Sequence, residues 1–378
     1  MLMKSKIMSK QPWSVLGIFL RKTSLALLLA LLAACVSTME EKAKTPEVLI
    51  WPSPPDLPRF AYETTLRSAA DLTVDSEDTA LRRQLTGETQ SRAPAMSKPY
   101  GVAARNGKIY VTDSVARNVA VFDVPRHKVY YMGVQKPGNL VKPSGIALDK
   151  VMNVYVADVT ERKVNVYDSL GLFQRSIGSK EYLERPTGVA VSADGDRIYV
   201  IDRSDNEKKN HRVVVFDASG RKLFVIGGRG GGDGQFNVPV QGAVGPDGTL
   251  YVLDAGNFRV QAFDRDGKFL RTWGKAGNNI GDFARPRGIA VDNEGNVYVT
   301  DATFANVQLF NAQGQLLLMI GSQSDTDKPA RFNLPGGIAV DETGRMYVAD
   351  QFFNKIEVIR RLTQEEGERI LKSADHKK

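Results

Sequence analysis

Short apolar segments alternate with polar turns along residues 99–362, and the same order of segments returns six times. Each unit begins with proline, reaches a glycine, continues as an apolar strand and a turn, and then has Tyr-Val-x-Asp before another strand. In the fifth unit the apolar segments are residues 288–291, 297–300, 307–310 and 316–320. Segments rich in Val, Ile, Tyr and Phe and bounded by Gly, Asp and Asn are typical of strands and hairpins. No helical periodicity runs through the units, so the pattern predicts an all-β domain.

The spacing of the units predicts how these strands are arranged. The prolines that open the units are 44, 43, 53, 47 and 49 residues apart: Pro99, Pro143, Pro186, Pro239, Pro286 and Pro335. A period of roughly 40 to 50 residues with four short strands in each unit is typical of propeller blades. We therefore expect a six-bladed β-propeller.

The sixth unit lacks its fourth strand, because residues 356–359 are followed by a charged tail. Residues 59–66 resemble the fourth strands of the other units, and they precede the first blade. We expect residues 58–67 to pair as the outer strand of blade six. This pairing closes the ring and leaves no long sheet edge exposed.

The units resemble NHL repeats. Their pattern Pro-x-Gly-Ile-Ala-Val-Asp, Asn-Val-Tyr-Val-Ala-Asp, Arg-Val-Gln-Val-Phe is nearly spelled out at residues 286–310 and 335–350, and the resemblance covers about four-fifths of the chain. It implies an NHL propeller over residues 58–362. It does not imply one function, because similar propellers serve as enzymes, protein docks and RNA binders.

The beginning of the chain has the features of an export signal. Five basic residues precede an apolar run at residues 25–31, and Leu32-Ala33-Ala34-Cys35 follows. A basic region, a short apolar core and small residues at the cut are typical of a secretory signal, and this core is too short to span a bilayer. The last four residues resemble the lipobox of bacterial lipoproteins, which implies removal of residues 1–34 and acylation of Cys35. The alternative is an ordinary membrane anchor with an incidental cysteine.

Lipid attachment at Cys35 has consequences for location. The two-part acylation that the resemblance implies is enough for stable membrane attachment. Because Val36 follows, and not an aspartate, we expect the periplasmic face of an outer membrane in a Gram-negative cell envelope. Residues 35–57 are then a tether, polar at first and proline-rich toward the propeller.

Removal of the leader also changes the charge. The whole chain has 51 basic and 43 acidic residues, but residues 1–34 contain five basic residues and no acidic ones. The mature chain therefore has 46 basic and 43 acidic residues, a net charge of +3. The basicity of the whole chain belongs largely to the leader, so we expect no nucleic-acid partner.

Two further segments lie outside the repeats. Residues 69–96 are a polar insertion in which residues 76–85 have the pattern of a short helix. Residues 363–378 are a charged tail, and Thr363-Gln364-Glu365-Glu366 has the form of a capping box at the start of a short helix.

Two motifs suggest ligand chemistry, and both have a simpler interpretation. The glycine-rich residues 227–234 lack the Gly-Lys-Ser/Thr of a phosphate loop and open no helix, while similar stretches occur at 274–282 and 321–328. We expect an inter-blade connector. The aspartate after each Tyr-Val suggests calcium, but a ring spread over six blades cannot converge on one ion. We expect each to cap the turn that follows its strand: Asp113, Asp158, Asp202, Asp254, Asp301 and Asp350.

Histidine-based metal chemistry has little basis in this sequence. The chain contains His127, His211 and His376, which fall in two different blades and in the tail. Structural and catalytic zinc sites need several ligands around one ion. We expect no metal site and no cofactor, and we interpret His211 as a solvated loop residue.

Function is expected where the sixfold pattern breaks. Six residues separate the aspartate from the next strand in five blades, but eleven separate Asp202 from Val213, which predicts a protruding charged loop in blade three. These loops should share one face with the Pro-x-Gly entries around the channel mouth. Basic and aromatic residues collect there, together with His211 in the long loop: Arg117, Arg162, Lys163, Lys208, Lys209, His211, Arg212, Phe258, Arg259, Arg287, Phe304, Phe352, Phe353 and Lys355.

Cations interleaved with aromatic residues predict a docking surface for an acidic partner. The alternative is that the basic residues pair with the nearby aspartates and the rings pack between blades. We expect a monomeric, lipid-anchored and non-catalytic propeller that binds an envelope protein or an acidic polymer. The competing hypothesis is an envelope hydrolase or lyase with a divalent-metal site at the channel mouth.

Overall fold

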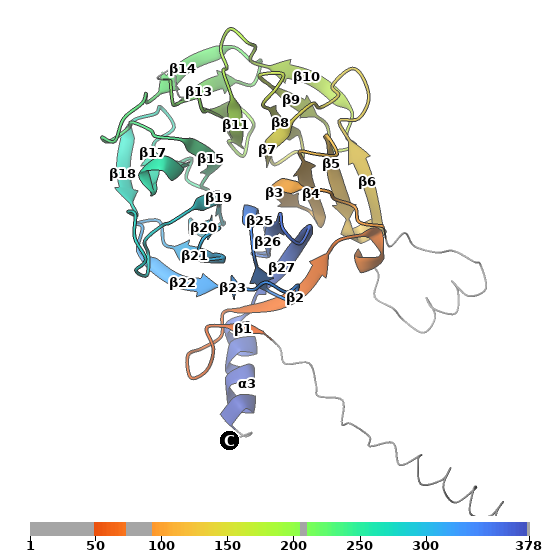
Figure 1. Ribbon diagram of the computed structural model, residues 1–378, viewed down its shortest axis with the longest axis vertical. Helices are drawn as coiled ribbons and strands as arrows, with labels where there is room; N and C mark the ends of the chain where they lie inside the picture. Colours follow the sequence, from red (N-terminus) through yellow and green to blue (C-terminus); the bar gives the residue numbers. More distant parts are fainter. Residues whose placement is uncertain (1–48, 73–92, 205–209, 376–378) are drawn as a thin grey trace, which may run out of the picture. The chain divides into compact units, whose positions relative to one another are not determined.

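The computed structural model describes residues 49–72, 93–204 and 210–375. Over these residues the regular structure is almost entirely β, with one α-helix, α3 (Gln364–Asp375). Six antiparallel sheets are arranged around a central channel (Figure 1). The predicted six-bladed β-propeller is therefore confirmed.

Blades one to five each use four consecutive strands, of which the first is innermost. Blade one contains β3 (Pro99–Arg105), β4 (Lys108–Asp113), β5 (Asn118–Asp123) and β6 (Lys128–Met132). Blade two contains β7 (Pro143–Leu148), β8 (Val154–Asp158), β9 (Lys163–Tyr167) and β10 (Phe173–Ile177). Blade three contains β11 (Pro186–Val191), β12 (Arg197–Asp202), β13 (Arg212–Asp217) and β14 (Lys222–Ile226). Blade four contains β15 (Pro239–Val244), β16 (Leu250–Asp254), β17 (Arg259–Phe263) and β18 (Phe269–Trp273). Blade five contains β19 (Pro286–Val291), β20 (Val297–Asp301), β21 (Asn306–Phe310) and β22 (Leu316–Ile320).

Blade six is assembled from both ends of the described chain. Its inner strands are β25 (Pro335–Val340), β26 (Met346–Asp350) and β27 (Lys355–Arg361), and its fourth strand is β2 (Phe60–Leu66). Strand β2 runs antiparallel to β27, from Phe60 opposite Arg361 to Leu66 opposite Ile356. The predicted closure is confirmed. The short strand β1 (Ile50–Trp51) adds a fifth, outermost strand, which the repeat pattern did not predict.

The hydrophobic core lies between the blades. Each core cluster combines side chains from two neighbouring sheets; one joins Val164 and Val166 of blade two to Val200 and Phe216 of blade three. The tyrosine of every Tyr-Val pair is almost fully buried in these layers. Both faces of each inner strand are covered, which explains why the strands are nearly continuous runs of Val, Ile and Tyr.

The glycine of the Pro-x-Gly entry allows the innermost strands to approach one another. A Cβ atom added to Gly145 would lie 2.6 Å from Cα of Gly188, and one on Gly337 would lie 2.8 Å from Cα of Gly101. No side chain fits these gaps, so glycine is required by close packing around the channel. Blade four departs from this rule, because Gln241 occupies the glycine position.

Neighbouring blades are also joined by buried hydroxyl groups. Thr112 Oγ1 donates to the carbonyl of Ser144 at 2.6 Å, and Thr300 Oγ1 makes the equivalent bond to Gly336 at 2.6 Å. In blades two and three the hydroxyl comes from the residue after the opening proline: Ser144 contacts the carbonyl of Pro186 at 3.2 Å, and Thr187 contacts that of Pro239 at 3.4 Å. Two sequence positions thus provide the same inter-blade bond.

The tail forms helix α3, which begins with reciprocal capping bonds. The backbone N–H of Glu366 donates to Thr363 Oγ1 at 3.2 Å, and the Thr363 N–H donates to the Glu366 carboxylate at 2.9 Å. Among the described residues, no helix has the length and apolar character needed to cross a bilayer. Cys35, the leader and residues 76–85 of the insertion lie outside the described residues.

Candidate functional site: the channel-mouth face

The Pro-x-Gly entries and the loops between the second and third strands lie on one face of the propeller. In blade one, Pro99 pairs with Asp113, and Asp113 pairs with Asn118, so all three are at the same end of the sheet. The other blades have the same register. We call this end the channel-mouth face; it is the face on which the sequence placed the candidate binding residues.

The six aspartates on this face are fully buried and cap backbone groups. Asp301 accepts four backbone N–H bonds, from Ala284 and Arg285 in the entry loop and from Thr303 and Phe304 in the following turn, at 2.8 to 3.2 Å. Asp113, Asp158 and Asp350 have the same arrangement. The predicted capping of the following turn is confirmed for these four aspartates, whereas Asp254 makes no such bond to its turn. Across the described parts of the chain, no group of three or more His, Cys, Asp or Glu side chains is placed to hold a metal ion.

Blades three and four satisfy their aspartates differently, through arginine. Arg212 Nε lies 3.2 Å from Asp202 Oδ2, and Arg259 Nε lies 3.1 Å from Asp254 Oδ2. Each arginine is directly opposite its aspartate in the strand register. Burial raises the pKa of both aspartates, while the backbone and arginine donors oppose that rise. Arg212 and Arg259 are therefore used in ion pairs within their own blades and not in a surface for a partner.

Arg259 also fixes the glycine-rich segment. Its two terminal nitrogens donate to the carbonyls of Gly231, Gly232 and Gln235 at 2.8 to 3.0 Å. The segment forms a parallel bridge between Arg229 and Phe236, and the connector after blade four has the same bridge between Ala276 and Phe283. The glycine-rich run is therefore an inter-blade connector, as the sequence predicted.

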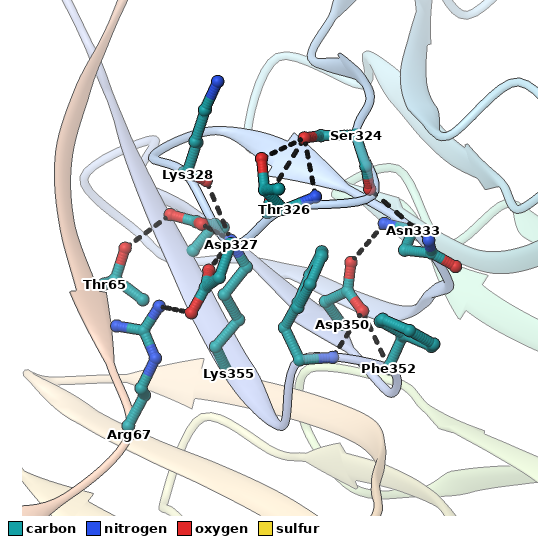
Figure 2. A network of polar contacts seen from close by, with 12 residues as sticks. Thr65, Arg67, Ser324, Thr326, Asp327, Lys328, Asn333, Asp350, Phe352 and Lys355 are labelled. Carbon is teal, nitrogen blue, oxygen red and sulfur yellow. Dashed lines mark hydrogen bonds and ion pairs between the residues drawn. The ribbon is translucent and has the colours of Figure 1, made fainter.

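Lys355 is completely buried within blade six (Figure 2). Its Nζ lies 2.9 Å from Asp327 Oδ1 and also pairs with the buried carboxylate of Glu357. Asp327 in turn pairs with Arg67, just after the closing strand, and Thr65 within that strand donates to Glu357 at 2.8 Å. This network links the closing strand to β27 and to the connector before blade six. Lys355 therefore holds the ring together and contributes nothing to an exposed surface.

His211 is buried as well, with 1% of its surface exposed, so the expectation of a solvated residue was wrong. Beside it, the backbone N–H of Asn210 donates to Ser204 Oγ at 3.0 Å, and the Asn210 side-chain amide donates to Glu184 at 3.0 Å. Burial, with smaller contributions from Arg229 and Arg203, lowers the pKa of His211. Lys208 and Lys209 lie outside the described residues.

The other candidates lie on blades one, two and six, where Arg117 and Phe352 are exposed and Arg162, Lys163 and Phe353 are half-buried. Arg117 and Arg162 occupy left-handed turn positions with φ of 59° and 55°, and no ion pair or side-chain hydrogen bond joins either to another described residue. Phe352 is 58% exposed and makes an edge contact with Phe353 at 5.0 Å between ring centres. The Nζ atom of Lys163 lies 3.9 Å from Glu161 Oε2. We call residues 115–117, 161–163 and 352–353 the exposed sector.

The remaining aromatic candidates are half-buried. Phe258 packs against the core between blades four and five, and Phe304 lies in the corresponding turn of blade five. The alternative interpretation of the sequence, in which arginines pair with aspartates and rings pack between blades, therefore describes Arg212, Arg259 and Phe258. The docking interpretation now applies only to the residues of the exposed sector.

Arg287, in the Pro-x-Gly entry of blade five, lies at the channel mouth. Its Nη2 donates to Gln351 Oε1 at 3.1 Å, and burial lowers the pKa of its guanidinium. Gln351 and Gln241 are both about nine-tenths buried, yet Gln351 Nε2 and Gln241 Oε1 have no hydrogen-bond partner among the described residues. The sequence interpretation missed both glutamines. Gln241 could have been noticed, because it replaces the glycine of the repeat; nothing in the pattern marks Gln351.

These features define the class of protein: a closed six-bladed β-propeller whose blades meet through short Pro-x-Gly strands. The chain carries NHL repeats; residues 183–216 and 283–309 match the NHL repeat family. A comparison with curated proteins finds no match.

Solved structures with the same fold include enzymes. A streptogramin B lyase is 15% identical with a TM-score of 0.53, and the match covers 71% of this chain and 95% of the lyase. A gluconolactonase from Xanthomonas campestris is 18% identical with a TM-score of 0.54 and coverage of 71% and 87%. A protein of unknown function from Bacteroides thetaiotaomicron is 18% identical with a TM-score of 0.57 and coverage of 79% and 76%. At these identities the likeness supports the propeller fold and not an activity.

Proposed function

We propose that this protein is a non-catalytic binding propeller that docks an acidic protein or acidic polymer of the cell envelope on its exposed sector. The observation that carries the proposal is the contrast within one face. Arg117 and Arg162 make no ion pair with a described residue, whereas Arg212 and Arg259 at related positions are neutralised internally. Uncompensated surface cations beside an exposed aromatic pair are typical of a docking surface.

The geometry of the sector supports this role. Blades six, one and two are neighbours in the ring, and the three segments of the sector lie at the channel-mouth end of these blades. Val115, 61% exposed, adds apolar surface beside Arg117. An apolar centre with cations at its edge gives a partner both buried area and long-range attraction.

The proposal includes attachment to the membrane through acylated Cys35. The leader and lipobox-like residues 32–35 support it, and the polar and proline-rich residues that follow are suited to a tether. We propose that this anchor holds the propeller at the periplasmic face of the outer membrane. Replacing Cys35 with Ser should release the protein into the soluble envelope fraction, and metabolic labelling with a palmitate analogue should label only the wild type.

The competing proposal, a metal-dependent hydrolase or lyase, has weaker support from the side chains. Each of the six buried aspartates is already engaged by backbone N–H groups or arginine. None of them is therefore available as a metal ligand or a general base without loss of a structural bond.

Charge reversal on one face tests the docking proposal. The double variant Arg117→Glu and Arg162→Glu should abolish binding to poly-L-glutamate and to the envelope partner identified by crosslinking in intact cells. The matched control is Lys128→Glu with Lys150→Glu, which places the same charge change on exposed residues at the opposite end of blades one and two. Binding that survives the first variant, or that is lost equally in both, would contradict the proposed surface.

A further inference from the structure

The channel mouth between blades five and six contains a cation without a counter-charge. Arg287 is half-buried, and its only side-chain bond to a described residue uses one N–H, which donates to the neutral amide oxygen of Gln351. No carboxylate among the described residues pairs with it. A buried or half-buried charge is costly unless it is compensated, and a guanidinium has five donors to satisfy. The guanidinium therefore keeps donors that are not used within the described residues.

Gln351 presents a second unused donor at the same place. Its Oε1 accepts from Arg287, which fixes the orientation of the amide and leaves Nε2 as the free end. The Nε2 atom has no partner among the described residues although the residue is only 8% exposed. Leaving a buried amide N–H₂ without a partner is destabilising. Two donors from adjoining blades therefore lie unsatisfied side by side.

The repeat leaves room beside these donors. Five blades have a side chain at the position after the opening proline, but blade six has Gly336. A Cβ atom there would lie 3.4 Å from Gln351 Nε2 and 3.5 Å from the carbonyl of Tyr100. Gly336 has no positive φ, so its backbone does not require glycine. The missing side chain keeps the space next to Nε2 open.

We propose that Arg287 and Gln351 form a carboxylate-binding site at the channel mouth, with Arg287 supplying the charge and Gln351 Nε2 the orienting hydrogen bond. Carboxylate fits this pair because arginine and amide donors bind its two oxygens with charge-assisted bonds. The carboxylate comes from a small organic acid or from the end of a peptide chain. Gln351 directly precedes Phe352 of the exposed sector, but the site uses different side chains and does not depend on the docking proposal.

Matched acids and amides identify the ligand chemistry. Binding to the full chain is measured by ligand-observed NMR with lactate against lactamide, and with tri-alanine against its C-terminal amide. Binding of an acid but not of its amide supports the site; lactate alone assigns a free organic acid, and the tripeptide alone assigns a chain end. Equal binding of acid and amide, or no binding of either acid, would overturn it.

Three variants locate the site. Arg287→Gln should weaken acid binding about tenfold or more, the scale of one charge-assisted hydrogen bond. Gln351→Glu provides an internal carboxylate for Arg287, so it should abolish acid binding while thermal unfolding stays the same or rises. Gly336→Ala fills the space beside Nε2 and should weaken binding several-fold.

The control is Arg285→Gln, which removes one exposed charge two residues from Arg287. It should change the affinity by less than about twofold, because surface charges act weakly over that separation in salt. If Arg285→Gln weakens binding as much as Arg287→Gln, the effect is a general positive potential and the proposed site is wrong.

Discussion

Blades three and four use the basic residues of the channel-mouth face differently from blades one and two. Arg259 and Lys163 occupy the same register position, opposite the buried aspartate, but Arg259 is inside the protein and bonds to Asp254. In blade two the turn supplies two N–H groups to Asp158, so no arginine is needed there. A buried carboxylate must be satisfied, and Asp254 accepts from Arg259 on the opposite strand and from the side-chain amide of Asn257 in the turn. The basic residues of blades one and two are thereby left for the surface.

The largest effect is expected from removal of the strand that closes blade six, the blade that carries Phe352 and Phe353. Deleting residues 58–67 exposes the edge of β27 and leaves Lys355, Glu357 and Asp327 without Thr65 and Arg67. We expect the loss of most of the free energy of unfolding, which for natural domains is about 5–15 kcal/mol. Urea unfolding followed by fluorescence measures it. Unchanged unfolding would refute both the closure and blade six as one edge of the sector.

Truncation of one buried and one exposed arginine of the channel-mouth face tests the contrast directly. Arg259→Ala leaves Asp254 and three connector carbonyls without their donor, and we expect a loss of about 3–5 kcal/mol, as for a broken buried ion pair. Arg117→Ala should change stability by less than about 0.5 kcal/mol, because no described residue pairs with it. Chemical denaturation of both variants gives the comparison. Similar losses of stability would show that blades three and four do not differ from blades one and two in their use of arginine.

A rise in pH should lower the free energy of unfolding through blade two and blade three to the same extent. Burial raises the pKa of Tyr155 in blade two and of Tyr199 in blade three to about 12, from 10 in the unfolded chain. Between pH 10 and pH 12 the folded state keeps tyrosine protons that the unfolded state loses. The stabilising contribution of these protons is therefore fully present below pH 10 and is lost as the pH rises toward 12. Each tyrosine contributes up to about 1.4 kcal/mol per pH unit in this window.

The measurement is the free energy of unfolding between pH 9 and pH 12. Tyr155→Phe and Tyr199→Phe should each reduce the slope by a similar amount. A reduction in only one of them would mean that the blades differ in their cores as well as on the channel-mouth face.

The smallest effect concerns the second internal arginine. Arg212 bonds to Asp202 and to the carbonyl of Tyr182, but its side chain is 22% exposed, against 10% for Arg259. Arg212→Ala should therefore cost about 1–2 kcal/mol, since partial solvation replaces some of the lost bonds. The result is read from the same denaturation curves. If Arg212→Ala loses as much stability as Arg259→Ala, the difference in side-chain exposure does not determine how much each ion pair contributes.

The sequence predicted most of the fold because the repeat states it six times. Pro-x-Gly, Tyr-Val and the following aspartate each have one local role, and the missing fourth strand of blade six indicated the closing segment. Whether each basic residue is buried in an ion pair or exposed at the surface could not be predicted in the same way. Arg259 is buried because carbonyls at residues 231, 232 and 235 meet it, and those residues belong to the connector from the previous blade.

The sequence by itself determined the number of blades, the all-β class, the closure and the turn-capping role of four of the six aspartates. These properties follow from local strand and turn chemistry repeated at a fixed period. Only the tertiary structure decided which hydroxyl joins each pair of blades, which cations are neutralised, and that Arg287 meets Gln351 across 64 residues of chain. The physical reason is that burial and pairing depend on groups brought together from different blades. No local pattern records those neighbours.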